Sequence, residues 1–408
     1  MDARARNRRS QTVALAFLTL AVASLALPLR IRLGLWLPVH LALAGAVATA
    51  ISGAMQMFAR ALTSTPESRP GLGVAQVTAV VAGAVAIAVG RVSGADGLLV
   101  LGGVSWMAGV VILGAIVWRA WARSVHRRHP VPIAAYGLAV CFAFLGGLAG
   151  AMLGSGALGA SAYLALRRIH PTLNVLGFAS LTIVGTLVTL LPTILRVRIV
   201  AWRGGLVVGL LAAGVALQAA GWALGVRWAE AAGGVAGAAG AVVLCVHVAL
   251  TLQTPRRFAI PTAAMHLLAG IAWFVGGSIW LAVQLGRGPI AVDLGRSTFL
   301  AVFVCGWLVQ VLLGAWAYLL PMGRPGSPQD HRAALQVFEV LGRVEVAALN
   351  AGLLLLVAGH WWLPAGGATV GWCLALTAVV WALTKTWAFP VLAGHLSAGD
   401  RGAAVWAA

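Results

Sequence analysis

Long apolar stretches, separated by short polar connections, follow one another along almost the whole chain. We distinguish twelve of them, each near or above the roughly 20 apolar residues that a membrane-spanning helix needs. They lack the period-two alternation of membrane strands. The pattern predicts an all-α polytopic membrane protein with helices at about residues 11–29, 34–60, 73–94, 97–119, 132–155, 170–196, 204–226, 229–252, 260–286, 298–320, 335–359 and 368–391.

Composition supports this prediction. Of the 408 residues, 61% are hydrophobic and only 9% are charged, whereas a soluble protein is about 25% charged. The net charge of +19 would suggest a nucleic-acid partner in a soluble protein. Here the arginines flank the apolar runs, which is typical of membrane topology. We therefore expect contact with the lipid bilayer and no nucleic-acid partner.

The arginines also predict an orientation. With a cytoplasmic N-terminus, the cytoplasmic segments hold 18 arginines and the opposite segments hold eight. Cytoplasmic loops are normally the basic ones, so we expect a multi-pass plasma-membrane protein with both termini in the cytoplasm. The basic and then apolar N-terminus resembles a signal peptide, but no small-residue cleavage site follows it. We interpret it as a retained first span.

Three predicted helices share a glycine pattern. In the second, sixth and tenth spans two glycines are eight residues apart: Gly45 and Gly53, Gly177 and Gly185, Gly306 and Gly314. The copies follow one another at intervals of roughly 130 residues, which indicates an internal repeat. We predict one membrane domain, residues 1–408, built from three four-helix units at about 11–119, 132–252 and 260–391, related by a pseudo-threefold axis along the membrane normal.

This organisation resembles subunit I of the haem-copper oxidases, in which twelve helices form three four-helix arcs and helices 2, 6 and 10 carry most metal ligands. His40, in the segment LPVHLALAG, resembles the low-spin haem ligand of helix 2. His170-Pro171 resembles the opening of helix 6, where the family has a copper ligand. The chain is also similar to NnrS-type haem and copper membrane proteins of an actinobacterial branch. The resemblance implies haem b, with copper as the other cofactor to consider.

The sequence differs from the oxidases at the positions that carry the oxygen-reducing site in that family. Span 7 has no histidine pair, and Phe303 and Cys305 stand where span 10 of the oxidases carries haem ligands. We therefore expect electron transfer, sensing of NO or O2, or cofactor handling rather than oxygen reduction. If the protein is an enzyme, it is an oxidoreductase. The expected partners are a redox protein or a quinone, and a second copy or another subunit.

Four histidines are candidate metal and cofactor ligands. His40 and His170 begin inward-running spans and should lie near the outer face, whereas His247 and His266 occupy the inner ends of consecutive antiparallel spans. Imidazole pairs from facing helices hold haem iron in bundle cores. We predict that His40 and His170 take part in an outer-side haem or copper site, either as two ligands or with one histidine and an open position, and that His247 and His266 lie within reach of one shared iron or metal ion. The alternative is that each imidazole forms a hydrogen bond at a helix contact.

Small and amide residues adjoin the first pair. Asn174 lies one helical turn after His170, and Gly45, Gly177 and Gly306 could leave room for a flat ring. We include these four residues in the predicted cofactor site. The structural alternative for Asn174 is an amide hydrogen bond between helices.

Span 11 carries an unusual group of polar residues, Glu339, Arg343, Glu345 and Asn350. Glu339 and Arg343 are four residues apart and could pair on one helix face. Ionisable groups inside a membrane usually serve a function, so a proton path or a propionate or quinone site is one hypothesis, and a buried structural ion pair is the other. For the whole chain, the alternative function is a cofactor-free transporter or an assembly subunit.

The orientation can be tested with topology reporters. Fusions at the N-terminus, at Ser327 and at Ala408 should all report a cytoplasmic location, because the arginine asymmetry places these points inside. A signal from the outer side of the membrane at any one of them would contradict the twelve-span topology and the equal orientation of the three repeats.

Overall fold

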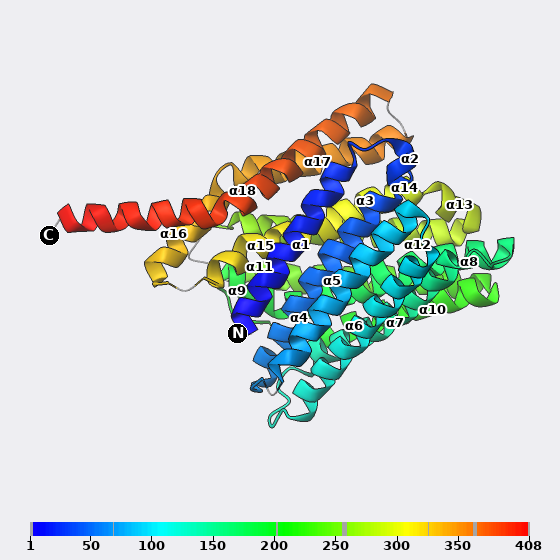
Figure 1. Ribbon diagram of the computed structural model, residues 1–408, viewed down its shortest axis with the longest axis horizontal. Coiled ribbons are helices and arrows are strands. Elements are labelled where there is room, and N and C mark those ends of the chain that lie inside the picture. The colour runs from blue at the N-terminus through cyan, green and yellow to red at the C-terminus, as the bar shows by residue number, and fades with distance from the viewer. Residues whose placement is uncertain are drawn as a thin grey trace. The chain divides into compact units, whose positions relative to one another are not determined.

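The computed structural model describes residues 3–67, 69–200, 203–254, 259–324, 326–361 and 365–406 (Figure 1). Within these ranges every regular element is a helix and no strand occurs, as predicted. In chain order the elements, with η for π-helical segments, are α1 (Ala3–Ser24), α2 (Leu29–Arg32), α3 (Trp36–His40), η1 (Leu41–Val47), α4 (Ala48–Thr63), α5 (Pro70–Ser93), α6 (Asp96–Ala122), α7 (Pro130–Gly154), α8 (Ala160–Pro171), η2 (Thr172–Ala179), α9 (Ser180–Leu195), α10 (Gly204–Leu224), α11 (Arg227–Gln253), α12 (Thr262–Arg287), α13 (Pro289–Leu294), α14 (Arg296–Phe299), η3 (Leu300–Val309), α15 (Gln310–Met322), α16 (Pro328–Glu339), α17 (Gly342–Trp361) and α18 (Ala365–Trp406).

Eleven helical stretches in the described ranges are long and apolar enough to cross a membrane. They correspond to the second to twelfth predicted spans, so the prediction of a polytopic membrane protein is confirmed at this level. The stretches are Trp36–Thr63, Pro70–Ser93, Asp96–Ala122, Pro130–Gly154, Ala160–Leu195, Gly204–Leu224, Arg227–Gln253, Thr262–Arg287, Arg296–Met322, Pro328–Gly359 and Gly366–Ala393.

The first predicted span, residues 11–29, is not among these stretches. A helix is present there, but α1 begins earlier and ends at Ser24. The basic residues of its first turns leave a shorter apolar run than a full span requires. Its apolar part is nevertheless packed against other helices, since Ala14 and Phe17 are buried.

The chain forms two compact units. Unit 1 comprises Met1–Pro192, Arg198–Thr254 and Val275–Gly295, and unit 2 comprises Thr193–Val197, Pro255–Phe274 and Arg296–Ala408. Unit 1 thus contains the first predicted repeat and, apart from residues 193–197, the second, and unit 2 contains most of the third.

The first glycine of each predicted repeat lies against an aromatic ring of the preceding long helix. A Cβ atom placed on Gly45 would lie 2.5 Å from the Phe17 ring, and one on Gly177 would lie 2.9 Å from the Phe142 ring. In unit 2 the corresponding distance from Gly306 to the Trp273 ring is 2.6 Å. The helices therefore approach closely because these glycines have no side chain.

The second glycines lie against the same helices about two turns further on. Gly53 packs against Ser10 of α1, and Gly185 packs against Ala135 of α7. In unit 2, Gly314 packs against Ala263 and His266 of α12. The eight-residue glycine spacing thus corresponds to two successive contacts between one pair of helices.

A π-helical segment surrounds each first glycine. Gly45 lies in η1, Gly177 in η2 and Gly306 in η3. A π-helical turn contains one more residue than an α-helical turn, so it changes the direction in which the following side chains point. Such segments are uncommon and are frequent at functional sites.

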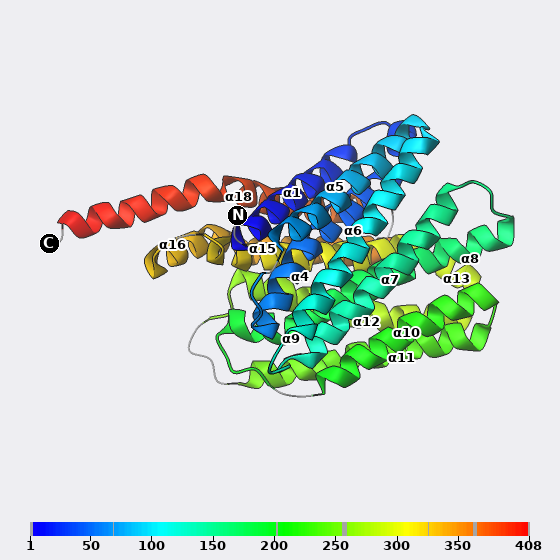
Figure 2. The same ribbon diagram turned by 60° about the horizontal axis from the view of Figure 1, so that its bottom comes forward.

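A second kind of glycine contact joins the two helices that end each predicted repeat. Glycines 19 residues apart meet backbone to backbone: Gly83 with Gly102, Gly214 with Gly233, and Gly352 with Gly371. A Cβ on any of the six would lie less than 3.0 Å from backbone atoms of the partner helix. These contacts produce closely packed helix pairs. In unit 1, α5 lies against α6 and α10 lies against α11 (Figure 2). In unit 2, α17 lies against α18 (Figure 1).

Adjacent glycines of α6 provide a matched test of this packing. Gly102→Ala should destabilise the protein by about 1–3 kcal/mol, because the new methyl group would overlap the α5 backbone. Gly103→Ala should be neutral or slightly stabilising, since nothing lies within 4 Å of its Cβ position. Thermal unfolding of the purified variants measures the difference. Equal midpoints for the two variants would show that the Gly102 contact does not limit the helix approach.

Candidate functional site

His40 and His170 each lie next to a π-helical segment of unit 1. His40 is the last residue of α3 and directly precedes η1, and His170 is one residue before the end of α8, which leads into η2. Pro171 has no N–H and cannot continue the regular α-helical hydrogen bonds, which favours a change of helix type at this point. The two histidines therefore stand at equivalent irregularities of two long helices.

The structure brings these two side chains together. The ring centroids of His40 and His170 are 6.3 Å apart, and the ring planes are inclined by only 16°. Both residues are half-buried. The sequence placed both near one membrane face, and the structure adds that they are neighbours.

One nitrogen of each ring is held by a backbone carbonyl. His40 Nδ1 lies 2.8 Å from the Trp36 oxygen, and His170 Nδ1 lies 2.9 Å from the Gly146 oxygen. A carbonyl only accepts hydrogen bonds, so each Nδ1 carries the proton. In a neutral imidazole the lone pair is then on Nε2, and no described residue forms a hydrogen bond with Nε2 of either ring. This arrangement is usual for metal-binding histidines.

The surroundings of the pair fix both rings. The Trp36 ring stacks on His40 with centroids 4.0 Å apart. On α7, a Cβ at Gly150 would lie 2.8 Å from His170 Cε1, and one at Gly146 would lie 2.7 Å from Asn174 Cγ. The two α7 glycines, which sequence reasoning missed, therefore make room for the imidazole and the amide. Their four-residue spacing before the His-Pro helix is a weak signal in a chain with 51 glycines.

Asn174 lies beside His170, as its spacing predicted. Its Nδ2 donates to the His170 carbonyl oxygen at 2.9 Å and lies 3.3 Å from His170 Nδ1. This hydrogen bond is within one helix rather than between helices. Asn174 therefore supports the segment that carries the imidazole.

The first glycines of the repeats have neighbours of a different kind. Gly45, Gly177 and Gly306 were predicted to leave room for a flat cofactor ring, and aromatic side chains of the protein occupy the adjoining space. In unit 2 the ring is that of Trp273, whose Nε1 donates to Asn350 Oδ1 at 2.7 Å. Asn350, predicted as part of a polar path, thus orients a packed indole.

The two histidines of the second predicted pair belong to different compact units. His247 is buried in unit 1 and His266 is buried in unit 2, so their predicted pairing stays a prediction. Within unit 2, His266 Nε2 lies 3.0 Å from Glu345 Oε1. His266 Nδ1 is buried without a hydrogen-bond partner among the described residues.

Glu345 also pairs with Lys385, the single lysine of the chain. Lys385 Nζ lies 2.5 Å from Glu345 Oε2 and donates to the carbonyl oxygens of Phe338 and Val340 at 3.0 and 3.2 Å. His266, Glu345 and Lys385, here called the unit 2 cluster, are only 1%, 5% and 5% exposed. Sequence reasoning did not include Lys385, although a lone lysine in an apolar span was a usable signal.

The unit 2 cluster lies where predicted span 11 is interrupted. α16 ends at Glu339, α17 begins at Gly342, and Leu341 between them has a left-handed φ of 52°. The predicted Glu339–Arg343 pair assumed one continuous helix, and among the described residues it does not form. Glu339 instead accepts hydrogen bonds from Thr262 N and Oγ1 at the start of α12, at 3.0 and 2.8 Å.

No group of three or more histidine, cysteine or acidic side chains in the described ranges could hold a metal ion. The His40–His170 pair is therefore a two-ligand arrangement, and its chemistry depends on what else a bound group would provide. Comparison of the sequence with models of protein families and with curated proteins finds no match.

Proposed function

We propose that this protein is a membrane haem-binding redox protein and that His40 and His170 are the two protein ligands of a haem b. The neighbouring position of the two imidazoles carries the proposal. Their ring centroids are 6.3 Å apart and their planes are inclined by 16°, so both side chains could serve one bound group.

The protonation of the two imidazole rings also supports their proposed role as ligands. Each Nδ1–H donates to a backbone carbonyl, which fixes the tautomer and leaves Nε2 as the ligand atom. Trp36 stacks on His40, and Gly150 accommodates the His170 ring. These contacts would hold both imidazoles in place without a cofactor and so limit the entropy lost on binding.

Two protein ligands suit haem better than a bare copper ion. The macrocycle supplies four equatorial nitrogens, so a haem iron takes only axial ligands from the protein. A copper ion between two imidazoles would require further donors in most of its geometries. Copper remains the alternative cofactor on the basis of the donor atoms alone, because imidazole binds both metals.

Haem supplies one-electron chemistry, and filling both axial positions favours electron transfer over gas binding. The chain's own residues would hold the ligands neutral and keep their orientation. A quinone or a redox protein is the proposed electron partner. If only one of the two histidines served as a ligand, gas binding or sensing would be favoured instead.

The recurrent glycine contacts support the wider resemblance to haem-copper oxidase subunit I. The same two kinds of contact occur at matching positions of three successive four-helix segments, twice in unit 1 and once in unit 2. We therefore propose three related units derived from one ancestral segment. Under the predicted orientation, His40 and His170 belong to the outer side of the membrane.

Replacing either histidine tests the proposal directly. In His40→Ala and in His170→Ala we expect haem retention to be weakened more than roughly tenfold, since loss of a ligand should cost at least as much as loss of a residue that supports one. The measurements are metal content and the reduced-minus-oxidised visible spectrum of gently purified protein. His126→Ala, an exposed histidine outside the site, is the matched control and should retain wild-type content.

Three results would contradict the haem proposal. Wild-type protein without haem after gentle purification is the first, and equal haem content in all three variants is the second. Copper in place of haem, lost in the same two variants, would support the histidine site but reassign its cofactor.

The unit 2 cluster favours a second candidate function, a proton-coupled transporter. Interrupted membrane helices with buried charges are typical of transporter binding sites. Lys385 donates to carbonyl oxygens at the end of α16, and Glu345 lies in the first turn of α17, so each charge is favoured by a helix dipole. His266 Nε2 lies 3.0 Å from Glu345 Oε1, and His266 Nδ1 has no hydrogen-bond partner among the described residues.

Stability and proton flux distinguish a transport site from a structural ion pair. Lys385→Met should lower the free energy of unfolding by about 3–5 kcal/mol, because Glu345 would remain buried without its partner. Combining Lys385→Met with Glu345→Gln should restore most of that loss. For transport, proton flux into proteoliposomes should fall in Glu345→Gln.

Glu230→Gln is the control for the flux measurement, since Glu230 is another buried carboxyl group in an apolar helix, outside the unit 2 cluster. Unchanged flux in Glu345→Gln, with the stability effects present, would identify the cluster as purely structural.

A further inference from the structure

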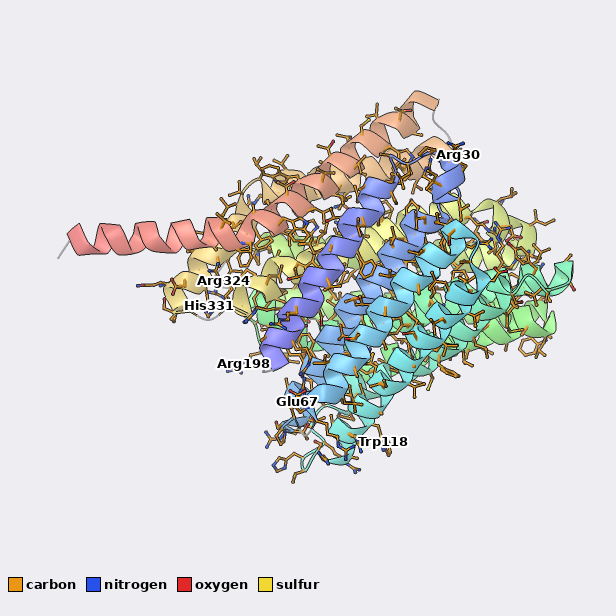
Figure 3. The ribbon with its side chains drawn as sticks, in the orientation of Figure 1. Arg30, Glu67, Trp118, Arg198, Arg324 and His331 are labelled. Atoms are coloured by element: carbon orange, nitrogen blue, oxygen red, sulfur yellow. The ribbon has the colours of Figure 1, made fainter. Side chains whose placement is uncertain are left out.

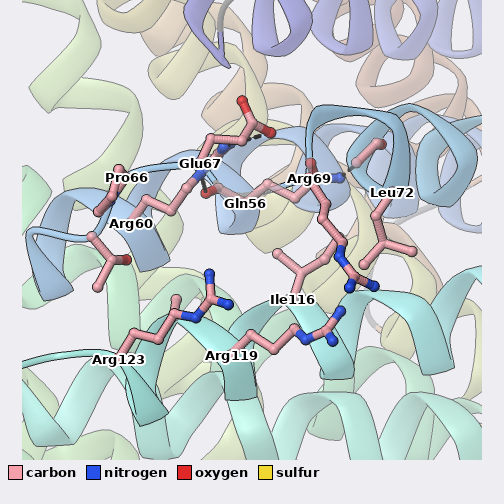
Figure 4. A pocket seen from close by; sticks show the side chains of 12 residues that line it. Gln56, Arg60, Pro66, Glu67, Arg69, Leu72, Ile116, Arg119 and Arg123 are labelled. Atoms are coloured by element: carbon pink, nitrogen blue, oxygen red, sulfur yellow. Dashed lines mark hydrogen bonds and ion pairs between the residues drawn. The ribbon is translucent and has the colours of Figure 1, made fainter.

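A small pocket with an unusually basic lining lies at one end of unit 1, away from the histidine pair. It has a volume of about 40 Å³, which is space for a few water-sized groups. Its walls come from the end of α4, the 65–69 connection, the start of α5 and the end of α6 (Figure 4). The arginines that line it are Arg60, Arg69, Arg119 and Arg123, and the one carboxylate is Glu67.

The single carboxylate is already engaged. Glu67 Oε1 lies 2.6 Å from Arg60 Nη1 and also pairs with Arg6, a buried residue that is not part of the pocket lining. Among the described residues no ion pair joins a carboxylate to Arg69, Arg119 or Arg123. In Figure 4 the guanidinium groups of Arg119 and Arg123 project from α6 toward the connection that carries Glu67. Four arginines against one glutamate leave the lining with an excess of three positive charges.

The backbone adds to this positive potential. α5 starts in the pocket wall, with Leu72 and Gly73 in the lining. The side chain of its N-cap residue, Arg69, forms no capping hydrogen bond, although the Arg69 carbonyl oxygen accepts from Leu72 N at 3.1 Å. No acidic side chain lies in the first turn. The N-terminus of a helix of 24 residues is a favourable place for an anion. The pocket therefore combines guanidinium groups and an uncapped helix start, both of which favour a phosphate group.

The pocket also lies beside a lipid-facing surface. Trp118 is 68% exposed and immediately precedes Arg119 in α6. Figure 3 shows Trp118 and Glu67 at the same end of unit 1, opposite the end that carries Arg30. Exposed tryptophans with arginines mark the interface between bilayer and water. Along α6, Val111 and Val104 are each 55% exposed and continue this apolar surface toward the middle of the helix.

We propose that this pocket binds the phosphate group of an anionic phospholipid at the predicted cytoplasmic surface. Arg119, Arg123 and Arg69 would contact the headgroup oxygens, while Glu67 holds Arg60 in the wall. The acyl chains would follow the exposed apolar face of α6. Basic pockets between membrane helices on the cytoplasmic side are suited to such headgroups. This proposal is independent of any cofactor at His40 and His170.

The general excess of cytoplasmic arginine is the competing explanation, because it would attract anionic lipids without a defined site. The test therefore compares two double variants of the full-length protein. Arg119→Gln with Arg123→Gln removes two charges from the pocket, and Arg128→Gln with Arg198→Gln removes two exposed charges from the same predicted side. None of these four arginines belongs to an ion pair of the described residues, so we expect both variants to fold.

Binding is measured by native mass spectrometry of the purified protein titrated with phosphatidylglycerol, phosphatidylcholine or inorganic phosphate. Wild type should retain one phosphatidylglycerol per chain and bind phosphatidylcholine more weakly. The pocket variant should bind phosphatidylglycerol roughly 30-fold more weakly, at about fivefold for each arginine. The control variant should stay within about twofold of wild type.

Equal losses in the two double variants would overturn the proposal, because the attraction would then come from diffuse charge. Equal affinity for phosphatidylcholine would overturn it as well. Inorganic phosphate that displaces the lipid and binds as tightly would show that the pocket takes a soluble phosphate compound instead. If the pocket variant does not fold, Arg69→Gln alone should give about a fivefold loss, and an unchanged affinity there would reject the site.

Discussion

Close approach of helix backbones at glycine is the constraint on which the rest of this structure depends. In a bilayer, burial of apolar surface does not drive helices together, so association relies on short contacts between small residues. At Gly83 and Gly102 a single methyl group would overlap the facing backbone. The same kind of contact recurs at matching positions of three chain segments, which explains why so apolar a chain can specify which helices become neighbours.

Buried polar groups follow a second constraint, since each needs a partner where water is absent. His40 and His170 satisfy one ring nitrogen with a backbone carbonyl and leave the other available. Lys385 instead uses backbone carbonyls that the end of α16 leaves unsatisfied. In both places the polar side chain stands next to an irregular stretch of helix. Irregular stretches of helix thus position polar side chains inside an apolar bundle.

The sequence was sufficient for eleven of the twelve predicted spans and for the glycine contacts, because hydrophobic length and helical period determine these features. It also predicted one membrane face for His40 and His170, whose rings are neighbours. It was insufficient where the helix departs from 3.6 residues per turn. The interruption at Leu341 separates Glu339 from Arg343, and the regular-helix argument that paired them then fails. The break at Leu341 has no local sequence signal comparable with a proline or a capping box, whereas η2 begins directly after Pro171.

His40 and His170 do not stand in the same register relative to the repeat glycines. His40 precedes Gly45 by five residues and His170 precedes Gly177 by seven, so the two side chains leave their helices in different directions relative to these glycines. Both intervals run through π-helical segments, so the π-helical geometry does not cancel the two-residue difference. The rings are instead positioned by their own contacts: the ring and carbonyl oxygen of Trp36 hold His40, and the Gly146 carbonyl oxygen holds His170. A shared site between the two histidines therefore does not require that they occupy equivalent positions of the repeat.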